Sequence, residues 1–582
     1  MGKRTIEVAS TGEALLELLA DRGVDYIFGN AGTDFPSIIE GLSKAAAGQS
    51  RAPIPITVPH ENLAVSMAHG AYLATGRAQA VMLHVNVGTA NAICGLLNAA
   101  REAIPMLVAA GRTPIMEDDV LGSRSVFIHW GQEMFDQAGM VREMVKWDYE
   151  LRRADQIEAV VDRALTVAMS APRGPVYLTL PREVLADGAG ALAYDSPSRR
   201  TAATAAAPNT EAVRRAAGWL AASENPLIVT GSFGRNPADV PALAALAEAY
   251  AVPVVGYRAR YLFLPSYHPM HLGHDPGPLL SAADTIVALD CDVPWIPKLH
   301  DVNPDAKVVH IGDDPLFTNY PMRSFRADLA IAGDARATLE ALSSALAEET
   351  HDRAKSIAAR RKWISAMRAE QDEARKAALA ATPDGDRATI GYVAACLNRA
   401  IGSGDTVVTE TAFPVGLLDR TELGTYFGTS PAGGLGWGLG AALGLKLGRP
   451  DRRVIAVVGD GSYMFGNPTP AHFVSAANEL PFLTVILNNA MWGAVRRATL
   501  SIYPEGAAAV SNRAPLTYLD PAPDYEKIVE ASGGYGEKVE RASDLPAALE
   551  RALHAVGVEG RQAVLNVLTA YSDADAKRDA RR

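Results

Sequence analysis

Two polar tips, each following an apolar run of the chain, are placed to hold one divalent cation. One run ends in GDGS (459–462), which contains Asp460, and a later run ends in Asn488-Asn489. Parallel strands present ligands beyond their carboxyl ends, so neighbouring strands can bring two such tips to one point. Mg2+ prefers oxygen ligands and shares its coordination shell with phosphates. We therefore predict a metal site formed by Asp460, the amide oxygen of Asn489 and the backbone carbonyl of Met491.

The small residues around Asp460 favour a phosphate group beside this cation. Gly459 and Gly461 let the backbone approach an anion, and the N–H groups that open the helix expected at Ser462 can face it. GDG alone is a common turn in a chain with 50 glycines. Its pairing with the second strand that ends in two asparagines makes the pattern informative.

This pair of motifs resembles the signature of thiamine-diphosphate (ThDP) enzymes. The resemblance is to 2-oxo acid decarboxylases and acetohydroxyacid synthases, and it implies ThDP and Mg2+ as cofactors. The segment PAGGLGW (431–437) is similar to the GGLGFA segment of benzoylformate decarboxylase. The similarity implies that the Gly433 carbonyl accepts a hydrogen bond from the cofactor's amino group and that Leu435 holds the cofactor bent. The alternative is a helix start at which glycine is merely small.

Glu61 follows a short apolar run and opens a segment rich in small residues. The resemblance implies that Glu61 bonds N1′ of the cofactor's pyrimidine, a role for a shielded carboxyl group with a matched proton affinity. The alternative is an acidic residue favoured by the helix dipole. The resemblance also implies that Glu61 of one subunit meets the diphosphate held by another, so a homodimer or homotetramer is expected.

His84 and Thr33 are candidates for the substrate side of the site. The segment LHVNVGTAN (83–91) resembles LHSAAGTGN of benzoylformate decarboxylase, which implies that His84 moves protons, as its near-neutral pKa allows. NAGTD (30–34) is similar to NPGSN, so Thr33 would replace a serine that binds the substrate carboxylate. Asp34 is a departure, because a second carboxylate there would repel the substrate.

A glutamine points toward another branch of the same family. GQEMFDQ (131–137), which contains Gln132, resembles the FQE segment of acetohydroxyacid synthases, where a glutamine lines the site. Non-oxidative decarboxylation of a 2-oxo acid is the favoured reaction. An acetolactate-synthase-like carboligase and a 2-hydroxyacyl-CoA lyase, acting on an acyl-CoA, stay open. A catalytically silent paralogue is a further alternative, against which Glu61, Asp460, Asn489 and Leu435 argue.

The elements that must position these residues are those of an α/β fold. Short apolar runs alternate with longer helical patterns, which is typical of parallel sheets covered on both faces. A Ser/Thr/Ala/Pro-rich linker (196–208) and a charged helical segment (348–381) divide the 582 residues. We expect three Rossmann-like, doubly wound units: 1–190 binding the pyrimidine, 208–350 in the middle, and 386–572 binding diphosphate and Mg2+.

The middle unit carries only a weak nucleotide signal. GSFGR (231–235) follows an apolar run but is not a GxGxxG fingerprint. Family members bind FAD or ADP in this unit or nothing, and we do not favour FAD or ADP here.

Composition excludes several other classes of protein. Lys plus Arg number 55 and Asp plus Glu 66, and the net charge of −11 argues against nucleic acid as a partner. The three cysteines, Cys94, Cys291 and Cys396, are too scattered for a disulfide framework or a zinc site. No signal peptide or membrane-length apolar run is apparent, so we expect a cytoplasmic protein without a membrane partner.

Overall fold

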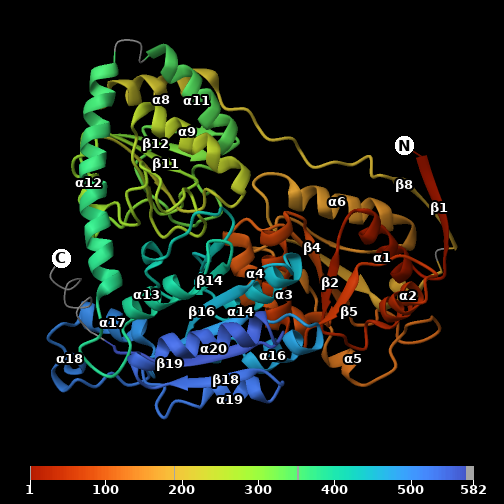
Figure 1. Ribbon diagram of the computed structural model, residues 1–582. Coiled ribbons are helices and arrows are strands. Elements are labelled where there is room, and N and C mark those ends of the chain that lie inside the picture. Colours follow the sequence, from red (N-terminus) through yellow and green to blue (C-terminus); the bar gives the residue numbers. More distant parts are fainter. Residues whose placement is uncertain (1, 189, 350–352, 572–582) are drawn as a thin grey trace.

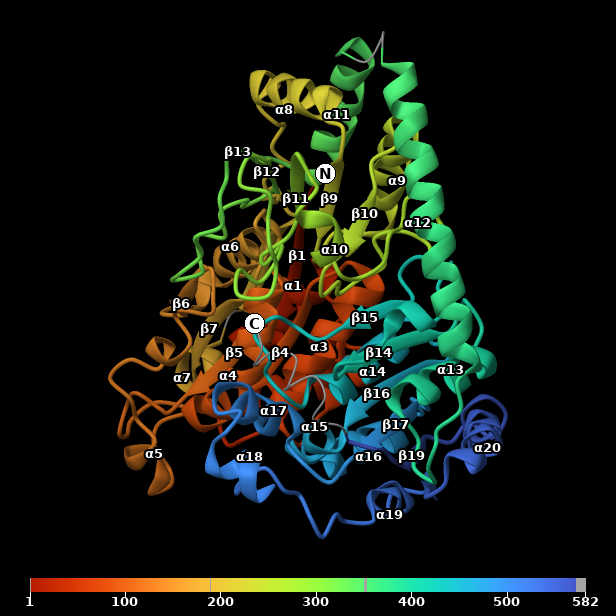
Figure 2. The same cartoon turned by 90° about the vertical axis from the view of Figure 1, so that its left-hand side faces the viewer.

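The computed structural model describes residues 2–188, 190–349 and 353–571 (Figure 1). The predicted unit ends at residues 1, 350 and 572 lie outside these ranges. Each predicted unit is built on one parallel sheet, and helices pack on the sheets. The predicted α/β class with three doubly wound units is therefore confirmed. Figures 1 and 2 show the middle unit above the other two, which lie side by side.

The N-terminal sheet has the strand order β3-β2-β4-β5-β7-β6. Its strands read as continuous apolar runs because helices cover both faces. The strands are β2 (Tyr26–Gly29), β3 (Ile54–Thr57), β4 (Gln79–Leu83), β5 (Met106–Arg112), β6 (Asp148–Glu150) and β7 (Val176–Pro181). The main helices are α1 (Thr11–Asp21), α2 (Pro36–Ala46), α3 (Glu61–Thr75), α4 (Val85–Arg101), α5 (Ile128–Gly131), α6 (Ile157–Met169) and α7 (Arg182–Ala186).

An antiparallel ribbon closes this unit, and the sequence patterns did not predict it. Strand β1 (Gly2–Val8) pairs with β8 (Gly190–Ser196), with Gly2 opposite Ser196. Residues 197–209 then lead to the middle unit without helix or strand, as the extended trace between β8 and α8 in Figure 1 shows.

The middle sheet has the order β10-β9-β11-β12-β13. Successive strands are added first on one side of β9 and then on the other, so the strand order reverses between β9 and β11. In open parallel sheets this switch point is the usual place for a ligand. The strands are β9 (Pro226–Thr230), β10 (Val254–Gly256), β11 (Thr285–Leu289), β12 (Lys307–Gly312) and β13 (Leu329–Ala332). The helices are α8 (Thr210–Ala222), α9 (Val240–Tyr250), α10 (Gly277–Leu280) and α11 (Ala335–Glu349).

The C-terminal sheet repeats the topology of the N-terminal one, with the order β15-β14-β16-β17-β19-β18. Its strands are β14 (Thr406–Glu410), β15 (Tyr426–Gly428), β16 (Val454–Gly459), β17 (Leu483–Asn488), β18 (Tyr535–Val539) and β19 (Ala563–Leu568). Its helices are α13 (Ile390–Ala400), α14 (Trp437–Gly448), α15 (Asp460–Phe465), α16 (Pro468–Ala477), α17 (Gly493–Ile502), α18 (Ala507–Ser511), α19 (Tyr525–Glu530) and α20 (Leu545–Gly557). Helices α3 and α14 occupy equivalent positions in the two units.

Helices α3 and α14 join the two units through small residues. They run parallel, with Asn62 beside Gly436 at one end and Ala74 beside Gly448 at the other. A Cβ on Gly444 would lie 2.1 Å from the Met67 carbonyl oxygen, so only glycine allows this approach. Both helices are almost wholly buried. The contact places the N-terminal ends of α3 and α14 together.

The segment predicted as one helix over 348–381 is divided between two. Helix α11 ends at Glu349, and α12 spans Ala354–Ala380. Helix α12 runs down one side of the molecule from the middle unit to the C-terminal unit (Figure 1). Arg368 donates to the Ser266 and His271 carbonyls of the middle unit, and Arg375 donates to the Gly416 carbonyl near the C-terminal sheet. Among the described residues, no helix is long and apolar enough to cross a membrane.

Candidate active site

The tips that carry Asp460 and Asn489 lie at the carboxyl ends of adjacent strands. Strands β16 and β17 pair in parallel, with Gly459 opposite Leu487. Asp460 is buried at the first turn of α15, directly after β16. Burial raises its pKa, and the nearby backbone N–H groups of Gly461, Ala490 and Met491 oppose the rise. The structure thus brings the two predicted tips together.

The carboxylate of Asp460 fits a cation. Its Oδ2 atom is buried and has no hydrogen-bond partner among the described residues. Burial raises the pKa of Asp460 to about 6. A divalent cation would give the buried oxygen a partner and favour the ionised form.

The other two predicted metal ligands, Asn489 and Met491, lie together in the loop after β17. Asn489 Oδ1 accepts the Met491 N–H at 3.1 Å, and the Met491 carbonyl accepts the Gly493 N–H at 2.9 Å. The described residues contain no group of three or more His, Cys, Asp and Glu side chains that would cage an ion alone. A single carboxylate suits Mg2+, which takes further oxygens from phosphates and water.

The glycine turn before α14 is fixed to the N-terminal unit. Gly433 and Gly436 have φ angles of 66° and 83°, a left-handed backbone that glycine adopts without strain. Asn98 of α4 donates to the Gly434 carbonyl at 2.8 Å and accepts its N–H at 3.0 Å. The Leu435 carbonyl lies 3.8 Å from Cys94 Sγ. The predicted cofactor residues Gly433 and Leu435 therefore lie between the two units.

Glu410 holds this turn by hydrogen bonds, and it is not among the predicted site residues. It ends β14, and its carboxylate accepts the N–H groups of Gly436 at 2.6 Å and Gly438 at 2.5 Å. Ser462, a predicted phosphate ligand, donates to the Glu410 carbonyl at 3.3 Å. Burial raises the pKa of Glu410 to about 7. The signal was present, because Glu410 ends an apolar run as Asp460 does.

Glu61 opens α3 and is held by two amide side chains. Asn30 Nδ2 donates to one carboxylate oxygen at 2.8 Å, and Asn91 Nδ2 donates to the other at 2.5 Å. The next residue, Asn62, lies beside Gly436. The structure therefore brings Glu61 to the glycine turn within one chain. Only the fold could reveal that Asn30 and Asn91 meet at Glu61, because Asn30 directly follows β2 and Asn91 lies in α4.

The three predicted substrate-side residues all lie in the N-terminal unit. His84 directly follows β4, and its ring Nδ1 lies 2.5 Å from Oδ1 of Asp34. Thr33, in the loop after β2, is exposed. The backbone carbonyl of Gln132 accepts a hydrogen bond from Asn86 at 2.8 Å, which brings it to the start of α4. Asp34 is buried and its carboxylate contacts His84. This contact explains why an acidic residue at position 34 need not repel a substrate carboxylate.

The switch point of the middle sheet contains a buried ion cluster. Arg260 lies 3.2 Å from Asp292, beyond β11. Arg260 Nε also lies 2.7 Å from Glu102 of the N-terminal unit, an ion pair without hydrogen-bond alignment. Tyr261 donates to Glu102 at 2.8 Å. These side chains lie where a nucleotide would bind in such a unit.

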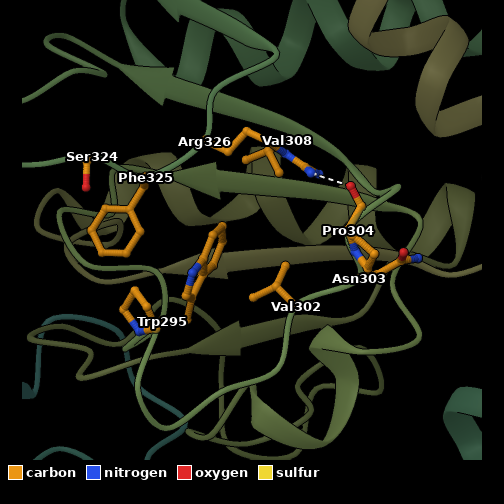
Figure 3. A pocket seen from close by; sticks show the side chains of 9 residues that line it. Trp295, Val302, Asn303, Pro304, Val308, Ser324, Phe325 and Arg326 are labelled. Atoms are coloured by element: carbon orange, nitrogen blue, oxygen red, sulfur yellow. Dashed lines mark hydrogen bonds between the residues drawn. The ribbon is translucent and has the colours of Figure 1, made fainter.

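A separate surface pocket in the middle unit lacks catalytic chemistry (Figure 3). Trp295, Val302 and Phe325 supply much of its wall. Its one charged lining residue, Arg326, donates to the Pro304 carbonyl at 2.5 Å. Val308 is near the amino end of β12, whereas ligands of parallel sheets bind at the carboxyl ends. This pocket is not the predicted site.

The fold and the site define a class of protein: two topologically equivalent α/β units that meet around a buried carboxylate, a glycine turn and an amide-held glutamate. The sequence matches the N-terminal TPP binding domain of thiamine pyrophosphate enzymes over residues 9–140, their central domain over 213–342 and their C-terminal TPP binding domain over 411–567. The chain belongs to the thiamine pyrophosphate enzyme family, whose members include decarboxylases and acetolactate synthases.

The curated relatives include enzymes named for different reactions. The chain is 27% identical to the acetolactate synthase isozyme 3 large subunit of Escherichia coli, over 95% of this chain and 93% of that protein. It is 29% identical to a probable 2-ketoarginine decarboxylase of Pseudomonas aeruginosa, over 94% and 91%. It is also 29% identical to the benzoylformate decarboxylase of the same species, over 83% and 86%.

A solved structure shares the fold. The 4-hydroxybenzoylformate decarboxylase of Rhodococcus jostii RHA1 superposes with a TM-score of 0.75 at 23% identity, covering 97% of this chain and all of that one. At this identity the likeness supports the fold alone.

Proposed function

We propose that this enzyme uses ThDP and Mg2+ to decarboxylate a 2-oxo acid without oxidation. Bound ThDP supplies an electron sink for the carbon–carbon bond that breaks. The observation that supports the proposal is the place of His84: its side chain is partly exposed, Asp34 raises its pKa most, and Glu61 is close enough to add to the rise. A decarboxylase must return a proton to the carbon that loses CO2.

Residues of the C-terminal unit would bind the metal and the diphosphate, and a residue of the N-terminal unit would contact the pyrimidine. Asp460, with Asn489 and the Met491 carbonyl, would hold Mg2+ and through it the diphosphate. Gly459, Gly461 and Ser462 would approach the diphosphate from the backbone side. Glu61 would hold a proton at the pyrimidine.

The substrate side would be formed by Thr33, His84 and Gln132. Thr33 would bind the substrate carboxylate, because its hydroxyl is exposed in the loop beside Asp34. His84 would donate the proton. Gln132 Oε1 is buried without a hydrogen-bond partner among the described residues, and a substrate group that reached it would supply one.

Product analysis tests this function. Purified enzyme with ThDP and Mg2+ is given pyruvate, benzoylformate and 2-ketoarginine separately, and CO2 and free aldehyde are measured. We expect one aldehyde per CO2 from at least one acid. A 2-hydroxy-3-oxo acid formed from two molecules of pyruvate would instead support the carboligase, which the relationship to acetolactate synthase favours as second candidate.

We also propose that the enzyme is at least a dimer, in which chains exchange the α3–α14 contact that the described chain makes within itself. Support comes from the family resemblance, and exchange of an identical element between protomers is a low-cost route to dimers. Glu61 of one chain would then serve the Asp460 site of another.

Mixing two inactive variants tests the exchange. Glu61→Gln and Asp460→Ala chains are unfolded, mixed in equal amounts and refolded. Exchange predicts about a quarter of wild-type activity, since half of the dimers are hybrids with one intact site. A mixture that stays inactive, while wild type treated alike recovers, would place each complete site within one chain.

A further inference from the structure

The departure at position 34 forms a buried contact with the proposed proton donor. Asp34 Oδ1 lies 2.5 Å from Nδ1 of His84, and the two side chains are 2% and 20% exposed. The remaining oxygen, Oδ2, accepts the Val85 N–H at 3.2 Å. Both oxygens of Asp34 are therefore engaged at the start of α4.

Two glycines make room for the side chains of Asp34 and His84, because a Cβ atom at either position would clash with them. A Cβ on Gly32 would lie 2.0 Å from His84 Nδ1, and one on Gly111 would lie 1.7 Å from Asp34 Oδ2. Val85 has a φ of 35°, a left-handed conformation that is costly for a β-branched residue. Residues near the ends of β2, β4 and β5 thus converge on the contact between Asp34 and His84.

The hydrogen bond determines what the exposed part of the ring can do. A carboxylate at Nδ1 keeps the proton on that nitrogen, as second partners of catalytic histidines do. The contact with Asp34 uses Nδ1, which leaves Nε2 as the ring nitrogen for another partner. In the protonated ring, Nε2 then carries the proton available to a substrate.

The charges around His84 favour the protonated ring. The hydrogen bond that His84 donates to Asp34 is the largest cause that raises the pKa of His84, burial opposes it, and Glu61 of α3 adds to the rise. His129 of α5 lies within electrostatic range, and burial lowers its own pKa, so it is mostly neutral near pH 7.

We infer that Asp34 is a positioning residue that orients His84 and keeps its ring protonated for donation from Nε2. The inference rests on the proposed function. In the step, the Nε2–H bond breaks, a C–H bond forms at the carbon that CO2 has left, and the neutral ring regains a proton from water.

Histidine titration by NMR tests this inference without cofactor or substrate. Protein labelled with 15N-histidine is titrated, with His84→Phe to assign the signal. In Asp34→Asn we expect the pKa of His84 to fall by about one unit or more, because the amide removes the negative partner. Asp136→Asn, which removes a carboxylate 55% exposed and paired with Arg142, is the control and should leave the signal unchanged.

Kinetics supply the second readout. In Asp34→Asn, kcat should fall about tenfold or more, its alkaline limb should move to lower pH, and KM and ThDP affinity should stay within about threefold. An unchanged pKa of His84 in folded Asp34→Asn would overturn the inference. If wild type releases no CO2 from any acid, the proposed function fails, and the titration alone still decides whether Asp34 controls His84.

Discussion

At the scale of the residue, the protonation of Glu410 makes the stability of the glycine turn before α14 depend on pH. Burial raises its pKa from 4.5 to about 7, although the N–H groups of Gly436 and Gly438 oppose the rise. Since the folded state holds this proton more tightly than the unfolded state, the contribution to stability is complete below about pH 4.5 and is lost as the pH rises through 7. The full difference is about 3 kcal/mol.

Glu410→Gln should remove this dependence, because an amide does not titrate. We expect the unfolding free energy of wild type to fall by about 3 kcal/mol relative to that of Glu410→Gln as the pH rises from 4.5 to 7.5. Urea unfolding of both proteins at each pH measures it. A difference that stays constant across the range would show that Glu410 is ionised throughout.

Glu61→Gln should separate catalysis from binding. The amide keeps most of the shape of the contact with Asn30 and Asn91 but cannot exchange a proton as a carboxylate does. Turnover should fall at least ~100-fold, while ThDP affinity, measured by calorimetry, stays within about tenfold, or ~1.4 kcal/mol. The exposed Glu143→Gln is the control. Unchanged turnover would remove Glu61 from the mechanism.

Residue types and strand ends predicted part of the site. Asp460 and Asn489 were predictable because each ends an apolar run, and parallel strands bring such ends together. Glu410 satisfied the same rule and was overlooked. The role of Asp34 was not predictable, since its sequence neighbour Thr33 is exposed while Asp34 turns inward to His84. The assigned roles of all these residues stay predictions until tested.

At the scale of the element, the packing of α3 against α14 depends on missing side chains. A Cβ on Gly444 would lie 2.1 Å from the Met67 carbonyl oxygen, whereas one on Gly218, within α8, meets nothing within 4 Å. Gly444→Ala should lower the unfolding free energy by about 1–3 kcal/mol or more through overpacking.

Gly218→Ala is the matched control and should raise stability by about 1 kcal/mol through helix propensity. Thermal midpoints of the two variants should move in opposite directions. Equal midpoints would mean that α3 and α14 do not pack closely in solution.

Alternation of apolar runs and helical patterns was sufficient to predict three parallel sheets. It did not predict the β1–β8 ribbon, because the two segments lack a continuous apolar run and are far apart in sequence. The charged segment 348–381 was read as one helix, since nothing in its composition marks the end of α11 at Glu349. The exact unit boundaries stay predictions.

At the scale of the whole molecule, the ion cluster at the middle sheet also ties two units together. Glu102 belongs to the N-terminal unit, and its partners Arg260 and Tyr261 belong to the middle unit. Glu102→Ala should leave the buried guanidinium partly unpaired and cost about 3 kcal/mol or more. Because the chain has several units, the readout is the first transition in a thermal scan. An unchanged first transition would contradict the link.

The same cluster leads us to expect a colourless protein. Arg260 and Asp292 lie in the crevice that a nucleotide would enter, so purified enzyme should show no flavin absorbance, and added FAD or ADP should not raise its thermal midpoint. A yellow protein, or a midpoint raised by either nucleotide, would reverse this expectation and strengthen the synthase reading.

Calorimetric titration with ThDP, in the presence of Mg2+ or of a chelator, examines most directly whether Asp460 and its neighbouring loop hold the cofactor through a cation. Wild type should bind ThDP with Mg2+ and bind it at least ~100-fold more weakly with chelator, a loss of about 2.7 kcal/mol. Asp460→Ala should bind weakly in both conditions, and the exposed Asp451→Ala should behave as wild type. Equal binding of ThDP by wild type and Asp460→Ala, with or without Mg2+, would contradict the site described above.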